Sequence, residues 1–326
     1  MTRSRPGRAL AAVLVLGVLA VGCSSDGAGT ATPSASTPGR SQVVAIVASV
    51  DLYASAPQRV SVGLVTNDNE LVSYGTVDFA FSYVGTAEQP QQPEAGPTAT
   101  ATFIPVFGTT GSGDAPRITL PSQGRGVYEA TDVTFDRAGF WQVSVTADVK
   151  DAGTQEALAT FEVGERPELP APGDPAIQTE NLTLDSKDVP QAAIDSRAAT
   201  EGRVPDPELH GWTIAHAIRA GRPALVVFST PVYCQSRFCG PVTNMVQDLA
   251  GRYPDRAVYV HVEIWKDFEN QVLNQAAVDW LQMPSGDLTE PWLFLIGADG
   301  TIVDRWSSMW SEDEVAAALE TLPAHG

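Results

Sequence analysis

Two of the three cysteines, Cys234 and Cys239, lie close together in the string C-Q-S-R-F-C. Thiols at this spacing can form a disulfide and exchange it with a thiol of another molecule. Cys239 precedes Gly240-Pro241, where a helix is expected to begin. Unpaired N–H groups and the positive end of that helix dipole would stabilise its thiolate. Cys239 therefore has the better electrostatic argument as the attacking thiol, although the order of attack stays open.

The third cysteine, Cys23, follows an export signal. Three arginines within the first eight residues precede an apolar run over residues 9–22. This run is too short to span a bilayer but typical of a secretory signal. The string LAVGC, followed by two serines, resembles the lipobox of bacterial lipoproteins, in which the cysteine is lipidated and becomes the mature N-terminus. The resemblance implies a lipid anchor at Cys23 on the extracytoplasmic face of the cell membrane; the alternative is an ordinary signal peptide with an incidental cysteine.

The composition limits the classes of partner. Asp and Glu number 39 against 20 Lys and Arg, a formal net charge of −19. Loss of residues 1–22 would leave 17 basic side chains and a net charge of −22. Nucleic-acid binding is excluded as a function because it needs a cationic face that releases counterions. The length of 326 residues and a hydrophobic content of 43% predict about two folded domains.

The composition divides the chain into five segments. Residues 1–22 are the predicted signal peptide, and residues 23–41 are a flexible tether rich in Ser, Thr, Gly, Ala and Pro. Residues 42–164 form the first folded region, residues 165–205 a Pro-rich linker, and residues 206–326 the second folded region.

The first folded region is predicted to be all-β. Alternating apolar and polar residues indicate strands within 59–66, 76–84, 126–135, 139–149 and 159–163. Residues 90–113 are rich in Pro, Thr and Gly and are predicted to be a long loop. The order G-x-Y-x-A, then F-x-x-A-G-x-W-x-V-x-V, resembles immunoglobulin-like domains of extracytoplasmic bacterial proteins, which implies a β-sandwich used for spacing or protein contact. Trp141 is expected in its core, and the alternative is a residue that stacks on a ligand.

The second folded region alternates helices and strands. The predicted helices cover residues 207–220, 241–252 and 270–283 and a last one from Ser311, which begins a capping box. The predicted strands cover residues 224–229, 257–264, 292–296 and 301–305, the last two forming a hairpin.

This order of elements resembles the thioredoxin fold over residues 206–322. VVFST precedes the cysteines as in the central strand of that family, and FCGPV is similar to a degenerate WCGPC. Glu290-Pro291 falls where the family places its cis-proline. The resemblance implies an α/β thioredoxin-like domain in which Cys239 and Cys234 are the catalytic cysteines, Pro291 shapes the site, and no cofactor is needed.

The sequence departs from the family at the resolving cysteine, which would fall at Val242. The second sulfur must therefore come from Cys234, which gives the spacing C-x4-C. One branch of the peroxiredoxins has a similar spacing, and Thr230-Pro231 resembles its T-P-x-C approach, but two residues separate the proline from the cysteine here. Copper chaperones of the Sco type share the fold, and a Cu(I) site could form from Cys234 and Cys239, with His261 as an optional third ligand.

These features predict a membrane-anchored, extracytoplasmic thiol–disulfide oxidoreductase that acts on a client or redox-partner protein through Cys234 and Cys239. The alternative from another class is a non-catalytic, protein-binding lipoprotein in which the same pair is a permanent structural disulfide. A peroxiredoxin-like peroxidase and a Cu(I) carrier are further alternatives.

Overall fold

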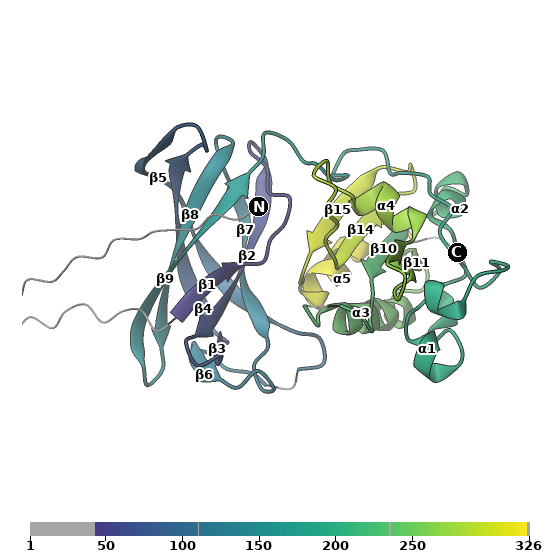
Figure 1. Ribbon diagram of the computed structural model, residues 1–326, viewed down its shortest axis with the longest axis horizontal. Helices are drawn as coiled ribbons and strands as arrows, with labels where there is room; N and C mark the ends of the chain where they lie inside the picture. Colours follow the sequence, from purple (N-terminus) through teal and green to yellow (C-terminus); the bar gives the residue numbers. More distant parts are fainter. Residues whose placement is uncertain (1–42, 110, 235, 325–326) are drawn as a thin grey trace, which may run out of the picture. The chain divides into compact units, whose positions relative to one another are not determined.

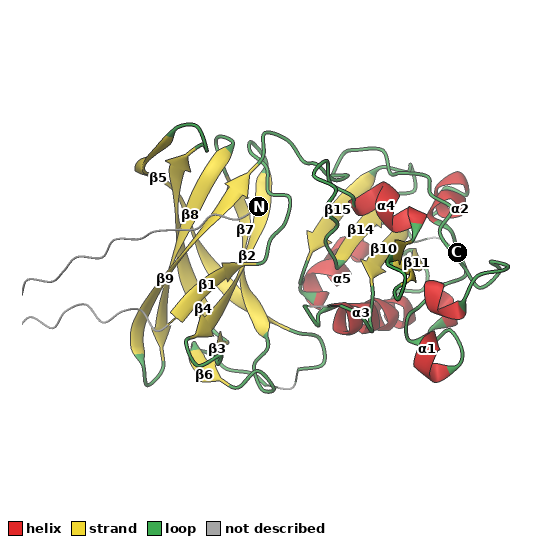
Figure 2. Ribbon diagram, in the orientation of Figure 1, coloured by secondary structure: helices red, strands yellow, loops and turns green. Residues whose placement is uncertain are grey.

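The computed structural model describes residues 43–109, 111–234 and 236–324 (Figure 1). The predicted signal peptide and the whole of the tether, including the lipidation site Cys23, lie outside these residues. The described part begins with an all-β region and continues into a region in which strands and helices alternate (Figure 2). It contains no helix that is both long enough and apolar enough to cross a membrane.

The all-β region consists of nine strands whose neighbours are antiparallel. The strands are β1 (Val43–Val47), β2 (Pro57–Thr66), β3 (Leu71–Ser73), β4 (Thr76–Gly85), β5 (Pro90–Pro105), β6 (Arg117–Thr119), β7 (Gly126–Thr134), β8 (Gly139–Val149) and β9 (Gly153–Val163). Their order is β6-β3-β2-β7-β5-β4-β8-β9, and β1 pairs with β2. The predicted alternation is confirmed, because β4 buries Val77, Phe79, Phe81 and Tyr83, and Trp141 of β8 is buried beside them.

Strand β5 corrects the prediction of a long loop at residues 90–113. It pairs with β4 along one edge and with β7 along the other. Its alternation of threonine with small residues ends in the buried Ala101 and Phe103. The glycine content also has a structural cause, because a Cβ at Gly96 would lie 2.5 Å from the Trp141 ring. The Gly- and Pro-rich composition therefore belongs to a strand that passes closely over Trp141.

The second region is built on a four-stranded sheet. Its elements are η1 (Gln191–Ala193), α1 (Ala198–Glu201), η2 (Pro207–Leu209), α2 (Ile214–Arg219), β10 (Ala224–Ser229), α3 (Cys239–Arg252), β11 (Val258–Glu263), β12 (Trp265–Asp267), β13 (Val272–Leu273), α4 (Gln275–Leu281), β14 (Trp292–Ile296), β15 (Ile302–Ser307) and α5 (Glu312–Thr321). The strand order is β11-β10-β14-β15. Strand β10 is parallel to β11 and antiparallel to β14, which forms the predicted hairpin with β15.

Helices cover both faces of this sheet (Figure 2). Leu225 and Val227 of β10 belong to an apolar cluster that includes residues of α3 and α5. Val226 and Phe228 face the opposite way, into a cluster with residues of α2 and α4. All six residues of β10 are buried, which confirms the prediction of a strand that is covered on both sides.

Two predicted helices are shorter than expected. The segment predicted as a helix over 207–220 divides into η2 and α2, because Thr213 caps α2 by accepting a hydrogen bond from the His216 N–H. The segment predicted as a helix over 270–283 begins instead with β13, which pairs with β12. Asn274 ends this hairpin, since its side-chain amide donates to the carbonyls of Ala193 and Glu263.

The segment predicted as a linker over 165–205 contains η1 and α1 and buries several of its residues. Leu169 packs in the α2–α4 cluster, and Asp195 and Ser196 are fully buried. Pro175 pairs with Thr301 next to β15. Much of this segment is thus part of the packing of the second region, which its proline content alone does not reveal.

Gly96→Ala tests the close passage of β5 over Trp141. The added Cβ must displace the ring, and we expect the free energy of unfolding to fall by about 1–3 kcal/mol, as in an overpacked core. Gly211→Ala is the matched control, because no atom lies within 4 Å of its added Cβ. It should change stability by less than about 0.5 kcal/mol. Urea unfolding of both variants makes the comparison, and equal stabilities would contradict this packing.

Candidate functional site

The structure joins Cys234 and Cys239 in a disulfide with 6.0 Å between their Cα atoms. Cys234 lies in the loop after β10 and is partly exposed, whereas Cys239 is the first residue of α3 and is fully buried. The predicted helix start next to Cys239 is confirmed. Val242, where the thioredoxin pattern has its resolving cysteine, is buried one turn further along the same helix.

Accessibility distinguishes the two sulfurs. A thiol that approaches from solvent meets the partly exposed Cys234 before the buried Cys239. The start of α3, however, stabilises a thiolate at Cys239 and not at Cys234. In the disulfide state, access therefore favours attack on Cys234, and electrostatics favours Cys239 as the sulfur that leaves.

A carboxyl group lies directly against the buried sulfur. Oε2 of Glu290 is 3.5 Å from Sγ of Cys239, and the same oxygen accepts a hydrogen bond of 2.7 Å from the Thr230 N–H. The predicted cis bond between Glu290 and Pro291 is confirmed. The sequence predicts Pro291 as the residue that shapes the site, but the prediction does not include Glu290. The available signal was an acidic residue directly before that proline.

The environment of Glu290 favours its neutral form. Burial is the main cause that raises its pKa to about 8; the negative charge of Glu263 adds to this, and the Thr230 N–H opposes it. At pH 7 the carboxyl group is therefore mostly protonated. It can give a proton to a thiolate formed at Cys239 and can recover one from a thiol.

A second carboxyl group lies behind the first. Glu263, the last residue of β11, is buried and accepts hydrogen bonds from the backbone N–H groups of Ser196 at 2.7 Å and Ile264 at 3.0 Å. Burial raises its pKa. The hydroxyl of Ser196 also accepts a hydrogen bond from the N–H of Val232, in the cysteine loop. The segment before α1 thus connects Glu263 to that loop.

His261 belongs to a different polar cluster. Its Nε2 lies 3.0 Å from the carbonyl oxygen of Ser229, which can only accept, so Nε2 carries a hydrogen. Its Nδ1 lies 3.3 Å from Oδ2 of Asp195. Burial lowers the pKa of His261, but contact with Asp195 outweighs burial and raises it. The protonated ring thus forms an ion pair with Asp195 through Nδ1 and a hydrogen bond with Ser229 through Nε2.

Asp195 is held by three basic side chains. Its Oδ2 lies 2.6 Å from Nη2 of Arg197 and 3.4 Å from Nε2 of His210. Burial works to raise the pKa of Asp195, but contacts with His210, His261 and Arg197 hold it far below its usual range. Both ring nitrogens of His261 are thus directed to Asp195 and Ser229. The third group near the two cysteine sulfurs is the carboxyl group of Glu290, and His261 belongs to the separate cluster with Asp195 and His210.

Comparison with known proteins adds little to this geometry. No protein-family model matches the chain, and no curated protein matches it. Among solved structures, the crystal structure of BslA, a bacterial hydrophobin, is similar at 14% sequence identity and a TM-score of 0.21. The match covers 39% of this chain and 96% of that one. A TM-score this low supports no conclusion about fold or function.

Glu290→Gln should change how stability depends on pH. The folded chain holds a proton on Glu290 that the unfolded chain loses above its ordinary pKa of 4.5, so this group lowers stability as pH rises from about 4.5 to about 8. The isosteric amide removes that contribution. We expect urea unfolding of the variant to show a smaller loss of stability between pH 5 and pH 8 than the wild-type chain. Glu269→Gln, at an exposed position, should retain the wild-type pH dependence; identical curves for all three proteins would refute a protonated Glu290.

Proposed function

We propose that this chain is an extracytoplasmic thiol–disulfide oxidoreductase, anchored by lipid at Cys23, and that residues 206–326 form a thioredoxin-like domain. The observation that carries the activity is the protonated carboxyl group of Glu290 beside the buried sulfur of the Cys234–Cys239 disulfide. The domain assignment is supported by the parallel β10–β11 pair, the antiparallel β14–β15 hairpin, helices on both sheet faces and cis-Pro291.

The first step is attack of a client thiolate on Sγ of Cys234. The bond between Cys234 and Cys239 breaks as a mixed disulfide forms between the client sulfur and Cys234. The electron pair of the broken bond remains on Cys239 as a thiolate. Glu290 then transfers its proton to that sulfur, 3.5 Å away.

The second step completes the exchange. A second client thiolate attacks the client sulfur of the mixed disulfide and releases Cys234 as a thiolate. The client has then gained a disulfide by losing two electrons, and the Cys234–Cys239 pair has gained those two electrons. The same steps run in reverse reduce a client disulfide, and the potentials of the two partners set the direction.

We also propose that the all-β region is the immunoglobulin-like sandwich expected from its sequence and holds the second region away from the membrane. The region places its aromatic side chains in the interior, with Trp141 against Tyr83 and Phe135. Trp141 is therefore a packing residue and not a ligand-stacking residue.

Full burial of Cys239 supports the competing hypothesis of a permanent disulfide, because a closed pair resists exchange. The reduction potential of the Cys234–Cys239 pair distinguishes an exchanging disulfide from a permanent one. Equilibration of the full chain in glutathione buffers, followed by thiol trapping, should give a potential above about −300 mV if the pair exchanges. A potential below about −300 mV would establish a structural disulfide and refute the oxidoreductase.

The role of Glu290 is tested by kinetics. With a dithiol peptide as reductant, we expect Glu290→Gln to slow reduction of the disulfide by roughly 10²-fold, the size of one general-acid contribution. The wild-type rate should also show a titration near pH 8 that the variant lacks. Glu269→Gln is the control for a lost surface charge and should keep both the rate and the titration. A variant that reacts at the wild-type rate with the wild-type pH profile would show that Glu290 transfers no proton.

A further inference from the structure

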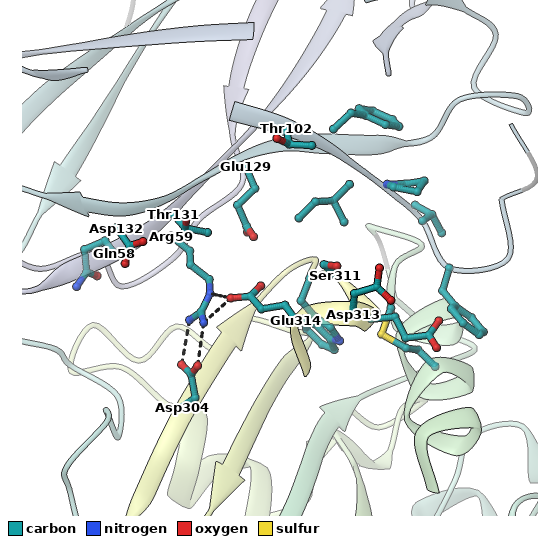
Figure 3. A pocket seen from close by; sticks show the side chains of 18 of the residues that line it. Gln58, Arg59, Thr102, Glu129, Thr131, Asp132, Asp304, Ser311, Asp313 and Glu314 are labelled. Atoms are coloured by element: carbon teal, nitrogen blue, oxygen red, sulfur yellow. Dashed lines mark hydrogen bonds and ion pairs between the residues drawn. The ribbon is translucent and has the colours of Figure 1, made fainter. Parts of the chain in front are cut away.

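A second site candidate is a cleft of about 1090 Å³ that shares no residue with the disulfide site (Figure 3). Strands β2, β5 and β7 supply one side of it, and β15 and the start of α5 supply the other. Its volume is slightly above the range of about 300–1,000 Å³ for small-molecule sites. The cleft is therefore large enough to hold an organic molecule.

One part of the cleft wall is apolar. It is formed by the end of β5 and the loop that follows, with Phe103, Ile104, Pro105 and Phe107. Val303 of β15 adds an apolar side chain that is 43% exposed. Such a surface favours the carbon skeleton of a ligand over a fully hydrated ion.

The rest of the wall is strongly acidic. Its carboxylates are Glu129, Asp132, Asp304, Glu312, Asp313 and Glu314. Arg59 is the one basic side chain among the lining residues, and it is already paired with Asp304 at 2.8 Å and Glu314 at 2.5 Å (Figure 3). The cleft therefore has a large excess of negative charge, which attracts cations and repels anions.

Glu129 lines the cleft, and its side chain projects from β7 toward the other lining residues (Figure 3). Its side chain is 7% exposed, and its Oε2 accepts a hydrogen bond of 2.7 Å from the Ser61 hydroxyl. Within the described residues, its other oxygen has no hydrogen-bond partner, and no basic side chain forms an ion pair with this carboxyl group. The carboxyl group is thus largely buried but keeps one oxygen open to the cleft, where it can accept a hydrogen bond from a ligand.

We propose that this cleft binds an organic cation, with an ammonium or guanidinium group against Glu129 and an apolar body against Ile104 and Phe107. The acidic wall requires a positive charge, and the apolar wall requires carbon to accompany it. A bare metal ion fits less well, because within the described residues the cleft carboxylates do not form a group of three converging ligand atoms.

Glu129 also makes binding sensitive to pH. Burial raises its pKa to about 7; the Ser61 hydroxyl and the charge of Arg59 lower it, and the charge of Glu314 raises it. These are the groups that face it from β2 and α5. A cation binds to the ionised carboxylate, so its affinity rises about tenfold from pH 6 to pH 8, and binding releases a proton below pH 7.

Dansylcadaverine is a suitable probe because it joins a fluorescent apolar ring system to a primary amine. Titration of the full chain in 0.15 M salt should give saturable binding with blue-shifted emission. The matched anionic probe, dansyl-6-aminohexanoate, should bind at least tenfold more weakly. Equal affinities for the two probes would show that the cleft selects only an apolar ring, and the proposal would be wrong.

Variants locate the binding site. Glu129→Gln should weaken dansylcadaverine binding about tenfold at pH 8 and abolish its dependence on pH. Glu88→Gln removes the same charge at an exposed turn outside the cleft and should leave both properties unchanged. Asp313→Asn, at an exposed position of the rim, should lower affinity by a factor of about 2–3 without affecting the fold. Wild-type affinity in both Glu129→Gln and Asp313→Asn would overturn the assignment.

Discussion

The complete burial of β10 is the constraint on which the disulfide site depends. A strand with no exposed residue must satisfy its polar groups within the protein where it ends. The Ser229 hydroxyl bonds to Thr243 of α3, and the Thr230 N–H donates to Glu290. Because β11 runs parallel to β10, it ends at the same edge, and because β14 is antiparallel, it begins there. Glu263 and Glu290 therefore reach the cysteine loop as a consequence of the sheet topology.

The second region accommodates its buried acids in two different ways. Asp195 contacts Arg197, His261 and His210, and these contacts keep it ionised although burial opposes its charge. Glu290 has no such cation within the described residues and remains protonated at neutral pH. Burial is costly for both, but one acid is stabilised by opposite charge and the other by losing its own. Of the two acids, only Glu290 carries a proton that it can transfer, and its carboxyl group lies beside the sulfur of Cys239.

Local patterns in the sequence predict much of this architecture, but they do not predict the polar contacts. The apolar run of β10, the alternation of β4 and β8 and the cis-proline at Pro291 are each determined by residues close together in the chain. The contact between Ser196 and Glu263 joins residues 67 positions apart, and neither has a periodicity that reveals the other. Strand β5 was missed for a related reason, since the ring that requires Gly96 belongs to the distant Trp141.

The contact between the all-β region and the second region has an apolar part, in which Val106 and Val127 pack in the α3–α5 cluster, and a polar part. Arg59 of β2 lies over the Trp306 ring while it pairs with Asp304, and Arg305 pairs with Asp51 at 2.7 Å. Within the described chain, none of these residues forms a hydrogen bond or ion pair with the cysteine loop. Beside Cys234, Val232 is 45% exposed and Phe268 is 41% exposed, and Tyr233 stacks on the Phe268 ring at 3.9 Å. These side chains form an apolar surface next to the accessible sulfur, where a client would make its first contact in the proposed exchange.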